Sequence, residues 1–300
     1  MKRIKKFIFA GLPLLGAAVL LEGCDQILLF NPKGPIGEAE RFVIIAAIAL
    51  MLIVVIPVAI MNLWFPWRYR ADRAGADYAP KWSSSMKIEL VVWLVPAIIV
   101  TLLGVLVWNS THRLDPYKPI DTGVQPVRIE AVSLDWKWLF IYPELNIATV
   151  NQLVFPAKVP LSFRLTSATV MTSFFIPQLG SQIYAMAGMQ TQLNLLANQT
   201  GTYRGLNTQF SGEGFASMHF NVNATSAQEF QDWVAQTKTG GSKLDDATFK
   251  KLETPDEPAE PVLFSEVRPG LFQSILQKFS GGHEMSASHE THVRLAQAQK

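Results

Sequence analysis

The chain has 300 residues, with 26 Lys and Arg against 24 Asp and Glu, and it contains a single cysteine. The formal charge of +2 is too small for a basic surface over the whole chain, which argues against nucleic-acid binding. One cysteine excludes an intrachain disulfide framework and any zinc or iron–sulfur site built from several thiolates of this chain. Charged residues make up only 17% of the chain, and three stretches near the N-terminus have none. Because soluble domains usually carry about one quarter charged residues, the composition predicts a membrane protein with a water-soluble half.

The first 23 residues have the parts of a secretory signal peptide. Basic residues within positions 2–6 precede the uncharged run 7–21, which is shorter than the about 20 residues that a transmembrane helix needs. The sequence Leu-Glu-Gly-Cys24 resembles the lipobox of bacterial lipoproteins, and Asp25 resembles the signal for staying in the inner membrane. The resemblance implies cleavage before Cys24, lipidation of its sulfur and acylation of the new N-terminus, for example with palmitate. The alternative is a buried Cys24 at the end of an uncleaved signal anchor.

Two transmembrane helices are expected next, at residues 41–67 and 88–111. Their charge-free central parts are long enough to cross a bilayer. The intervening loop, 68–87, has five basic and two acidic residues, which indicates a cytoplasmic location by the positive-inside rule. The segment 24–40 and the chain after residue 111 are then periplasmic, in agreement with an exported N-terminus.

Glu89 stands at the cytoplasmic edge of the second expected span. Ionisable groups at membrane depth often mark ion or proton paths. A carboxylate in the first turn of a helix is also stabilised by the helix dipole and can be hydrated among the lipid headgroups. Position alone favours this second, ordinary interpretation.

From residue 112 the hydrophobic pattern changes to a period of two. Polar and apolar residues alternate over 127–132, 161–165 and 189–195, and turns rich in Pro and Gly separate these runs. This alternation is typical of half-buried strands. Several short strands without intervening helical patterns predict an antiparallel β-sandwich or barrel over residues 112–225.

The segment 226–280 returns to a helical period. Ser226 and Glu229 have the spacing of a capping box, which predicts a helix that begins there. A second short helix is expected at 247–252, and further aromatic and aliphatic residues form a last apolar face. The polar tail 281–300 is expected to be disordered.

Three motifs, in this order, resemble subunit II of the haem-copper terminal oxidases. They are DWKWLFIYP at 135–143, MTSFFIPQLG at 171–180 and QIYAMAGM at 182–189. The residues of these motifs are most similar to the quinol-oxidising branch, the cytochrome bo type. The resemblance extends from Cys24 to about residue 279. It implies a membrane-anchored α+β fold: a two-helix transmembrane hairpin, a cupredoxin-like antiparallel β-barrel and a short helical C-terminal segment.

The resemblance raises the question of whether this chain binds copper. In the cytochrome c-oxidising branch the domain holds two copper ions through two bridging Cys thiolates, two His, a Met and a backbone carbonyl. The matching positions in this sequence are Thr172, Ser211, Glu213, Phe215, His219 and Val222. Of these, Glu213 matches the acidic residue of the motif. A delocalised copper pair needs thiolates, which these side chains do not supply. We therefore expect no metal in this chain and interpret His219 as an ordinary strand residue.

The resemblance implies that the chain is a non-redox subunit of a proton-pumping ubiquinol oxidase in the aerobic respiratory chain. The haems and a copper ion are then expected in a partner subunit I, which also oxidises ubiquinol and binds this chain together with smaller membrane subunits and lipid. In the family, the position of Glu89 resembles the cytoplasmic mouth of a proton-uptake channel, so the resemblance implies that Glu89 contributes to proton entry. Trp136 and Trp138 resemble the pair that passes electrons in the copper branch, but without copper we interpret them as interface and core aromatics.

Two alternatives from other classes stay open. One is a copper-binding subunit II of a cytochrome c oxidase, which the residues at the copper positions disfavour. The other is a freestanding envelope lipoprotein that assembles other proteins and needs no membrane partner. A hydrolase is not supported, because none of the five histidines lies in a recognisable Ser or Cys nucleophile motif.

Overall fold

The computed structural model describes residues 28–70, 83–256 and 260–279. The chain divides into two units, of which one is Ile36–Asp115 and the other combines the chain before and after that segment. The predicted signal peptide, the lipidation site Cys24 and the tail lie outside the described residues, as does most of the predicted cytoplasmic loop.

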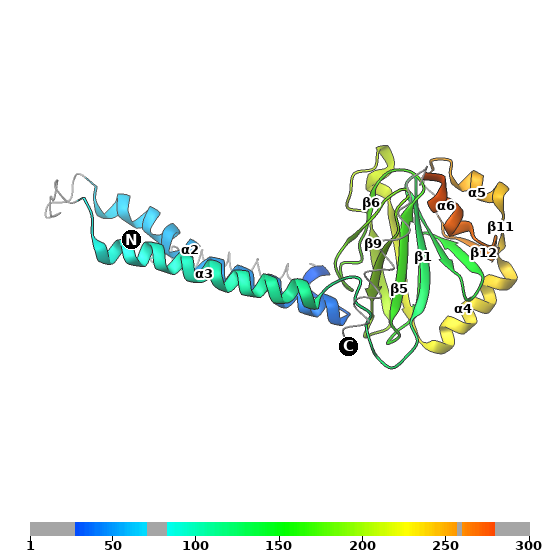
Figure 1. Ribbon diagram of the computed structural model, residues 1–300, viewed down its shortest axis with the longest axis horizontal. Helices are drawn as coiled ribbons and strands as arrows, with labels where there is room; N and C mark the ends of the chain where they lie inside the picture. Colours follow the sequence, from blue (N-terminus) through cyan, green and yellow to red (C-terminus); the bar gives the residue numbers. More distant parts are fainter. Residues whose placement is uncertain (1–27, 71–82, 257–259, 280–300) are drawn as a thin grey trace, which may run out of the picture. The chain divides into compact units, whose positions relative to one another are not determined.

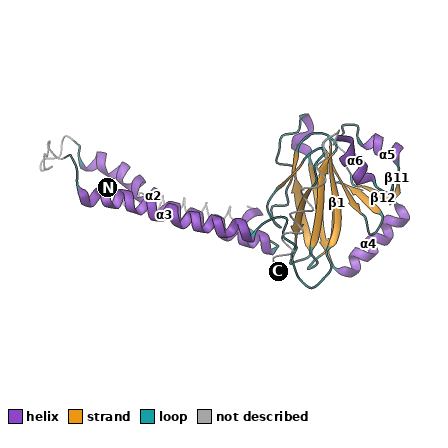
Figure 2. Cartoon of the chain, in the orientation of Figure 1, coloured by secondary structure: helices purple, strands orange, loops and turns teal. Residues whose placement is uncertain are grey.

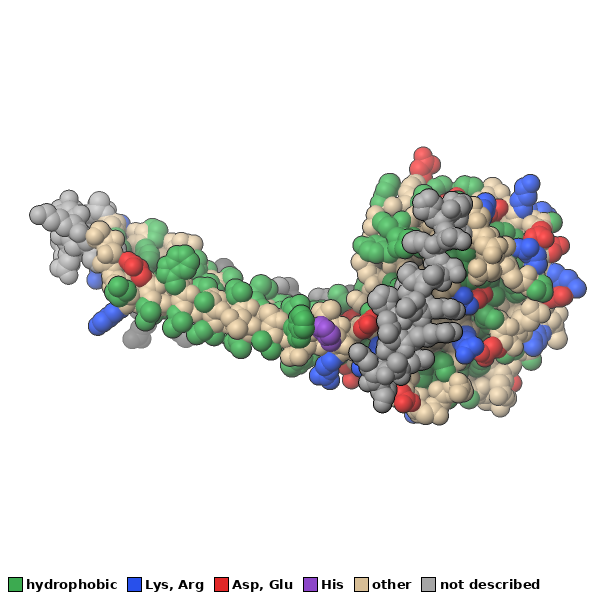
Figure 3. Space-filling view, viewed as in Figure 1, with side chains coloured by type: hydrophobic (Ala, Val, Ile, Leu, Met, Phe, Trp, Pro, Cys, Tyr) green, Lys and Arg blue, Asp and Glu red, His purple; other side chains and the backbone are tan. Residues whose placement is uncertain are grey.

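The first unit consists of two long helices, α2 (Pro35–Arg68) and α3 (Met86–Arg113) (Figures 1 and 2). Both are long and apolar enough to cross a membrane. The first begins at Pro35, six residues before the expected start, because proline suits the first helical position and a helix can continue through a polar turn. On the face that Figure 3 shows, hydrophobic side chains line this unit, as expected for helices that contact lipid or a partner helix.

The second unit is mostly β-structure, with short helices near its C-terminal end (Figure 1). Its strands are β1 (Val127–Leu134), β2 (Lys137–Tyr142), β3 (Ile147–Val150), β4 (Gln152–Pro156), β5 (Leu161–Ser167), β6 (Thr172–Phe174), β7 (Ile183–Ala185), β8 (Thr191–Leu195), β9 (Gly201–Leu206), β10 (His219–Thr225), β11 (Ser242–Leu244) and β12 (Val262–Val267). Its helices are α4 (Ala227–Gly240), α5 (Asp246–Leu252) and α6 (Leu271–Phe279), with 3-10 turns η2 (Leu28–Phe30) and η3 (Glu213–Ser217).

Within the described residues the strands form three sheets. The largest has the order β11-β12-β3-β2-β1-β5-β8, the second β4-β10-β9, and β6 pairs with β7. The two apolar helices, the mostly β unit and the short C-terminal helices agree with the expected fold class, although β1–β5, β4–β10 and β11–β12 are parallel pairs and the described sheets do not close into a barrel. A period of two identifies a strand, but it carries no information about the direction of the neighbouring strand.

The interior of the β-unit is aromatic. The rings of Trp138, Phe140, Phe163, Phe174 and Phe220 are fully or almost fully buried. Phe174 stacks on Phe220 with centroids 5.2 Å apart, and Trp138 meets the edge of Phe174 at 5.2 Å. Such offset and T-shaped pairs add to the free energy gained by removing the rings from water.

The C-terminal segment differs from the predicted helical addition. The capping box is confirmed, since Ser226 and Glu229 exchange the two expected hydrogen bonds at the start of α4. Between α4 and α6, however, β11 and β12 extend the largest sheet, and β12 pairs antiparallel with β3. Together with α5 and α6 these strands build a second hydrophobic core, which includes Leu139, Ile141, Phe249, Phe264 and Phe272.

Candidate functional site

The DWKW motif forms the tight turn between β1 and β2. Leu134 pairs directly with Lys137, so Asp135 and Trp136 make up the turn. Trp136 has φ = 63°, a left-handed conformation that is uncommon for a bulky residue and costs of order 1–3 kcal/mol. Its indole Nε1–H donates to the carbonyl oxygen of Ser211 at 3.1 Å. The turn is therefore bound to the loop that contains three of the six predicted copper positions, Ser211, Glu213 and Phe215.

The two tryptophans of the motif lie in different environments. Trp136 is half-buried against the loop, whereas Trp138 is 0% exposed in the aromatic core. The indole N–H of Trp138 has no hydrogen-bond partner among the described residues, although its backbone N–H donates to Asn151 Oδ1 at 2.8 Å. Trp138 thus acts through packing, while Trp136 is the member of the pair that reaches toward the surface.

Asn207 organises the loop that follows β9. Its Oδ1 accepts hydrogen bonds from the backbone N–H of Ser173 at 2.9 Å and of Gln209 at 3.0 Å. Its Nδ2 donates to Ser211 Oγ at 3.1 Å and lies 3.3 Å from Met218 Sδ. These bonds bring β6 and the 207–218 loop together, although about 35 residues separate them in the chain. Asn207 was not among the predicted site residues, because no local pattern distinguishes it from any other turn asparagine.

The structure places the six copper positions in unlike surroundings. Thr172 and Val222 are buried, Ser211 and Phe215 are half-buried, and Glu213 and His219 are exposed. The Thr172 hydroxyl has no hydrogen-bond partner in the described part of the chain. Along β10 the burial alternates, so His219 and Val222 lie on opposite faces of that strand.

This donor set does not fit a dinuclear copper centre. The positions of the two bridging thiolates carry the hydroxyl of Ser211 and the phenyl ring of Phe215, and the methionine position carries the alkyl side chain of Val222. No group of three or more His, Cys, Asp or Glu residues that could hold a metal ion occurs among the described residues. The buried Met218 is bound into the Asn207 network instead.

An aromatic pair stands at the exposed side of the same loop. The rings of Phe210 and Phe215 are 5.7 Å apart, and Phe210 is 73% exposed. Exposed large aromatic side chains next to a well-anchored loop are typical of surfaces that bind another protein.

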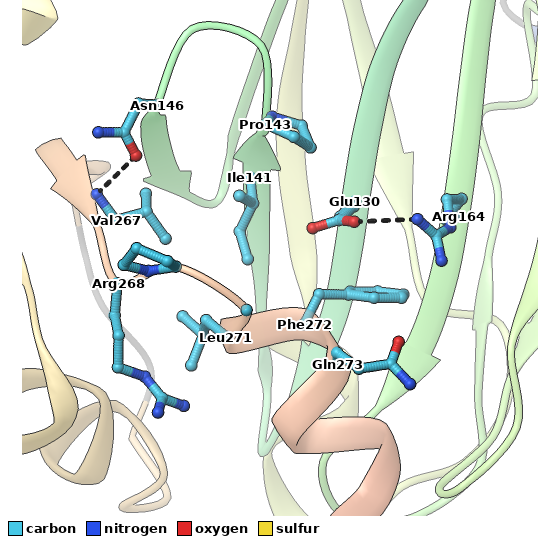
Figure 4. Close-up of a pocket in the computed structure, with 12 residues that line it drawn as sticks. Glu130, Ile141, Pro143, Asn146, Arg164, Val267, Arg268, Leu271, Phe272 and Gln273 are labelled. Atoms are coloured by element: carbon cyan, nitrogen blue, oxygen red, sulfur yellow. Dashed lines mark hydrogen bonds and ion pairs between the residues drawn. The ribbon is translucent and has the colours of Figure 1, made fainter.

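A pocket of about 260 Å³ lies between the largest sheet and α6 (Figure 4). Glu130 of β1 and Arg164 of β5 point toward each other across it, with Oε1 and Nη1 3.4 Å apart. Burial raises the pKa of Glu130, and the nearby Arg164 opposes this shift. The guanidinium of Arg164 also lies 5.3 Å from the centroid of Phe272. The carboxylate of Glu130 and the guanidinium of Arg164 neutralise each other, and Arg164 joins α6 to the sheet through its contact with Phe272.

Glu89 lies in the first turn of α3, where its backbone N–H donates to Ser85 O at 2.9 Å. Its side chain is exposed within the described chain. This placement agrees with the expected position at one end of the second helix, and it leaves the carboxylate accessible to solvent, lipid or a partner.

Comparison with known proteins assigns the family. Residues 142–225 match the family described as the periplasmic domain of cytochrome c oxidase subunit II. Residues 238–283 match the COX aromatic rich motif, and this segment contributes Phe249, Phe264 and Phe272 to the second core. The two matches together support a cupredoxin-like domain that carries a C-terminal addition.

Relatives of similar length narrow the assignment. The chain is 54% identical to cytochrome bo(3) ubiquinol oxidase subunit 2 of Pseudomonas aeruginosa over 280 residues, which cover 93% of this chain and 84% of the relative. It is 50% identical to the protein of the same name from Pseudomonas putida, with 94% and 90% coverage. It is 47% identical to ubiquinol oxidase subunit 2 of Acetobacter aceti, with 95% and 92% coverage.

These identities confirm the resemblance that the three sequence motifs indicated. They favour the quinol branch over a copper-binding cytochrome c oxidase subunit and over a freestanding envelope lipoprotein. The chain therefore belongs to the ubiquinol oxidase subunit 2 family of the haem-copper oxidases.

Proposed function

We propose that this chain is a copper-free, non-redox subunit II of a proton-pumping ubiquinol oxidase in a bacterial inner membrane. The observation that carries the proposal is the donor set at the copper positions, where Ser211 and Phe215 replace both thiolates. Electrons from ubiquinol then reach the haems and copper of subunit I without passing through this chain. Trp136 and Trp138 keep a packing role in this scheme.

The chain would cap and brace subunit I. The helices α2 and α3 expose apolar side chains along their length, which suits contact with lipid and with the helices of subunit I or smaller membrane subunits. We place the loop 68–87 in the cytoplasm and the β-unit in the periplasm, because of the basic residues in that loop. The exposed Phe210 and its partner Phe215 offer an aromatic anchor on the β-unit.

The test is to purify the chain with its partners from native membranes in a mild detergent. Oxygen uptake is then compared with ubiquinol and with reduced cytochrome c as electron donors. We expect haem-containing material that consumes oxygen with ubiquinol alone. Activity with cytochrome c, or stoichiometric copper on this chain, would contradict the proposal. A haem-free, inactive monomer would favour an envelope lipoprotein.

We further propose that Glu89 takes part in proton uptake from the cytoplasm. Its support is an exposed carboxylate in the first turn of α3, at the end that follows the basic loop. Glu89→Gln keeps the size of the side chain but removes the acid. We expect turnover at saturating quinol to fall by about tenfold or more, equivalent to about 1.4 kcal/mol in the barrier.

Glu38 provides a matched control for this variant. It is an exposed carboxylate in the first turn of α2, which by the proposed topology faces the other side of the membrane. Glu38→Gln should leave turnover unchanged. Equal turnover in the wild type and in Glu89→Gln would refute the role of Glu89.

We also propose that residues 1–23 are removed as a signal peptide and that Cys24 carries the lipid. The support is the lipobox-like sequence and the short uncharged run before it. Intact mass spectrometry should find a chain that begins at Cys24 with diacylglycerol and an acyl group attached. Cys24→Ser should retain the first 23 residues, and a wild-type chain of full length without lipid would exclude this processing.

A further inference from the structure

Lys137 is a lysine with almost no contact with water. It follows the Asp135–Trp136 turn in β2, and its side chain is 1% exposed. Lysine is almost never fully buried unless its ammonium group is paired, because removing that charge from water costs several kcal/mol. The partners of the Lys137 ammonium group therefore indicate the structural role of this residue.

Both partners of the ammonium group come from one short stretch of the C-terminal segment. Lys137 Nζ donates to the backbone oxygen of Thr254 at 2.9 Å and to the carboxylate of Asp256. These residues lie between α5 and β12, almost 120 positions away in the chain. The carboxylate of Asp256 is 63% exposed, so the ion pair has one buried and one hydrated end. The C-terminal segment is thereby bound to the sheet at a point outside its hydrophobic contacts.

Trp136, the residue before Lys137, contacts the 207–218 loop. Trp136 donates to the Ser211 carbonyl from its left-handed conformation, and its indole lies 3.5 Å from the position that a side chain on Gly212 would occupy. A strained conformation persists only when its surroundings hold it. One peptide bond joins Trp136 to Lys137. Trp136 is bound to the 207–218 loop, and Lys137 is bound to the 253–256 stretch. Displacing the lysine therefore displaces the tryptophan.

We propose that Lys137 is a positioning residue that fixes the 253–256 stretch on the sheet and, through Trp136, holds the 207–218 loop in place. Paired with Asp256, it couples the aromatic-rich C-terminal segment to the loop that carries the degenerate copper positions. The proposal concerns contacts within this chain, so it stands or fails independently of the electron donor that the oxidase uses.

The test is amide hydrogen exchange, measured by mass spectrometry on the purified oxidase complex. Asp256→Ala removes the carboxylate and leaves a buried ammonium group that must seek water. We expect exchange to become about tenfold faster in 253–256 and in 207–218, with β5 and β8 unchanged. Lys137→Met fills the same space without a charge and should accelerate exchange in 253–256 while the domain stays folded. Its folding keeps the anchoring of 253–256 testable even if Asp256→Ala fails to fold.

Two further variants separate positioning from a general loss of charge. Lys243→Met removes an ion pair of the same segment, with Glu266 at 2.7 Å, whose side chains are both exposed. It should not change exchange in either stretch. Asp256→Glu, which has room because the carboxylate is exposed, should restore wild-type exchange. Unchanged exchange of 253–256 in both Asp256→Ala and Lys137→Met would overturn the anchoring role, and unchanged exchange of 207–218 in Asp256→Ala would overturn the coupling.

Discussion

Phe220 is a central side chain of the aromatic core of the β-unit. Its ring is 1% exposed and lies within 6 Å, between centroids, of the rings of Trp138, Phe140 and Phe174. Removing a buried phenyl group costs about 3–5 kcal/mol, because transfer free energy is lost and the surrounding rings cannot fully close the cavity. The three ring pairs place Phe220→Ala toward the upper end of that range.

This loss should appear as a lower melting temperature of the β-unit. For a domain of this size each kcal/mol shifts the melting temperature by about 2–4 °C, so Phe220→Ala should melt about 6–20 °C below the wild type. Near-ultraviolet circular dichroism of the full chain in mild detergent follows the packing of the buried aromatic rings, and the tryptophans of α2 and α3 contribute equally to the spectra of wild type and variant. Phe210→Ala removes the same group from a side chain that is 73% exposed, and it should melt within about 2 °C of the wild type.

A melting temperature of Phe220→Ala within about 2 °C of the wild type would refute this role of Phe220. Such a result would mean that the core collapses around the missing ring. A large shift in Phe210→Ala would instead mean that the exposed ring contributes to the fold rather than to a binding surface.

The remaining predictions concern Gly205 in β9 and the N-terminal cap of α4. Gly205→Ala should lower the melting temperature by about 2–12 °C, because an added Cβ overlaps the ring of Phe220 on the paired strand. Ser226→Ala should cost about 1 kcal/mol, the usual value of an N-terminal cap, and about 2–4 °C in the same melt. Hydrogen bonds from Ser226 hold the pKa of Glu229 below its ordinary value, so its contribution to stability is full above the unfolded-state pKa and is lost as the pH falls through the lowered value. Melts of wild type and Glu229→Ala should therefore differ at pH 7 and converge in acid, whereas a constant difference would contradict this assignment.

Local features of the sequence were sufficient for much of the fold. The charge-free runs predicted both long helices, and alternation predicted β1, β5 and β8 close to their observed bounds. The capping box at Ser226 lies within four consecutive residues, so its geometry follows from the sequence alone. The three ordered motifs at 135–143, 171–180 and 182–189 also indicated the family, which the relatives confirm.

Other features depend on partners that are distant in the chain. The directions of β1 and β5, the addition of β11 and β12 to the largest sheet, and the role of Asn207 follow from contacts between residues tens of positions apart. Lys137 shows the difference most clearly, since a lysine between two tryptophans reads as a surface residue until Asp256 and Thr254 are brought to it. Hydrophobic periodicity records only which face of an element avoids water, whereas strand direction, edge pairing and the burial of a charge depend on which distant segment covers that face.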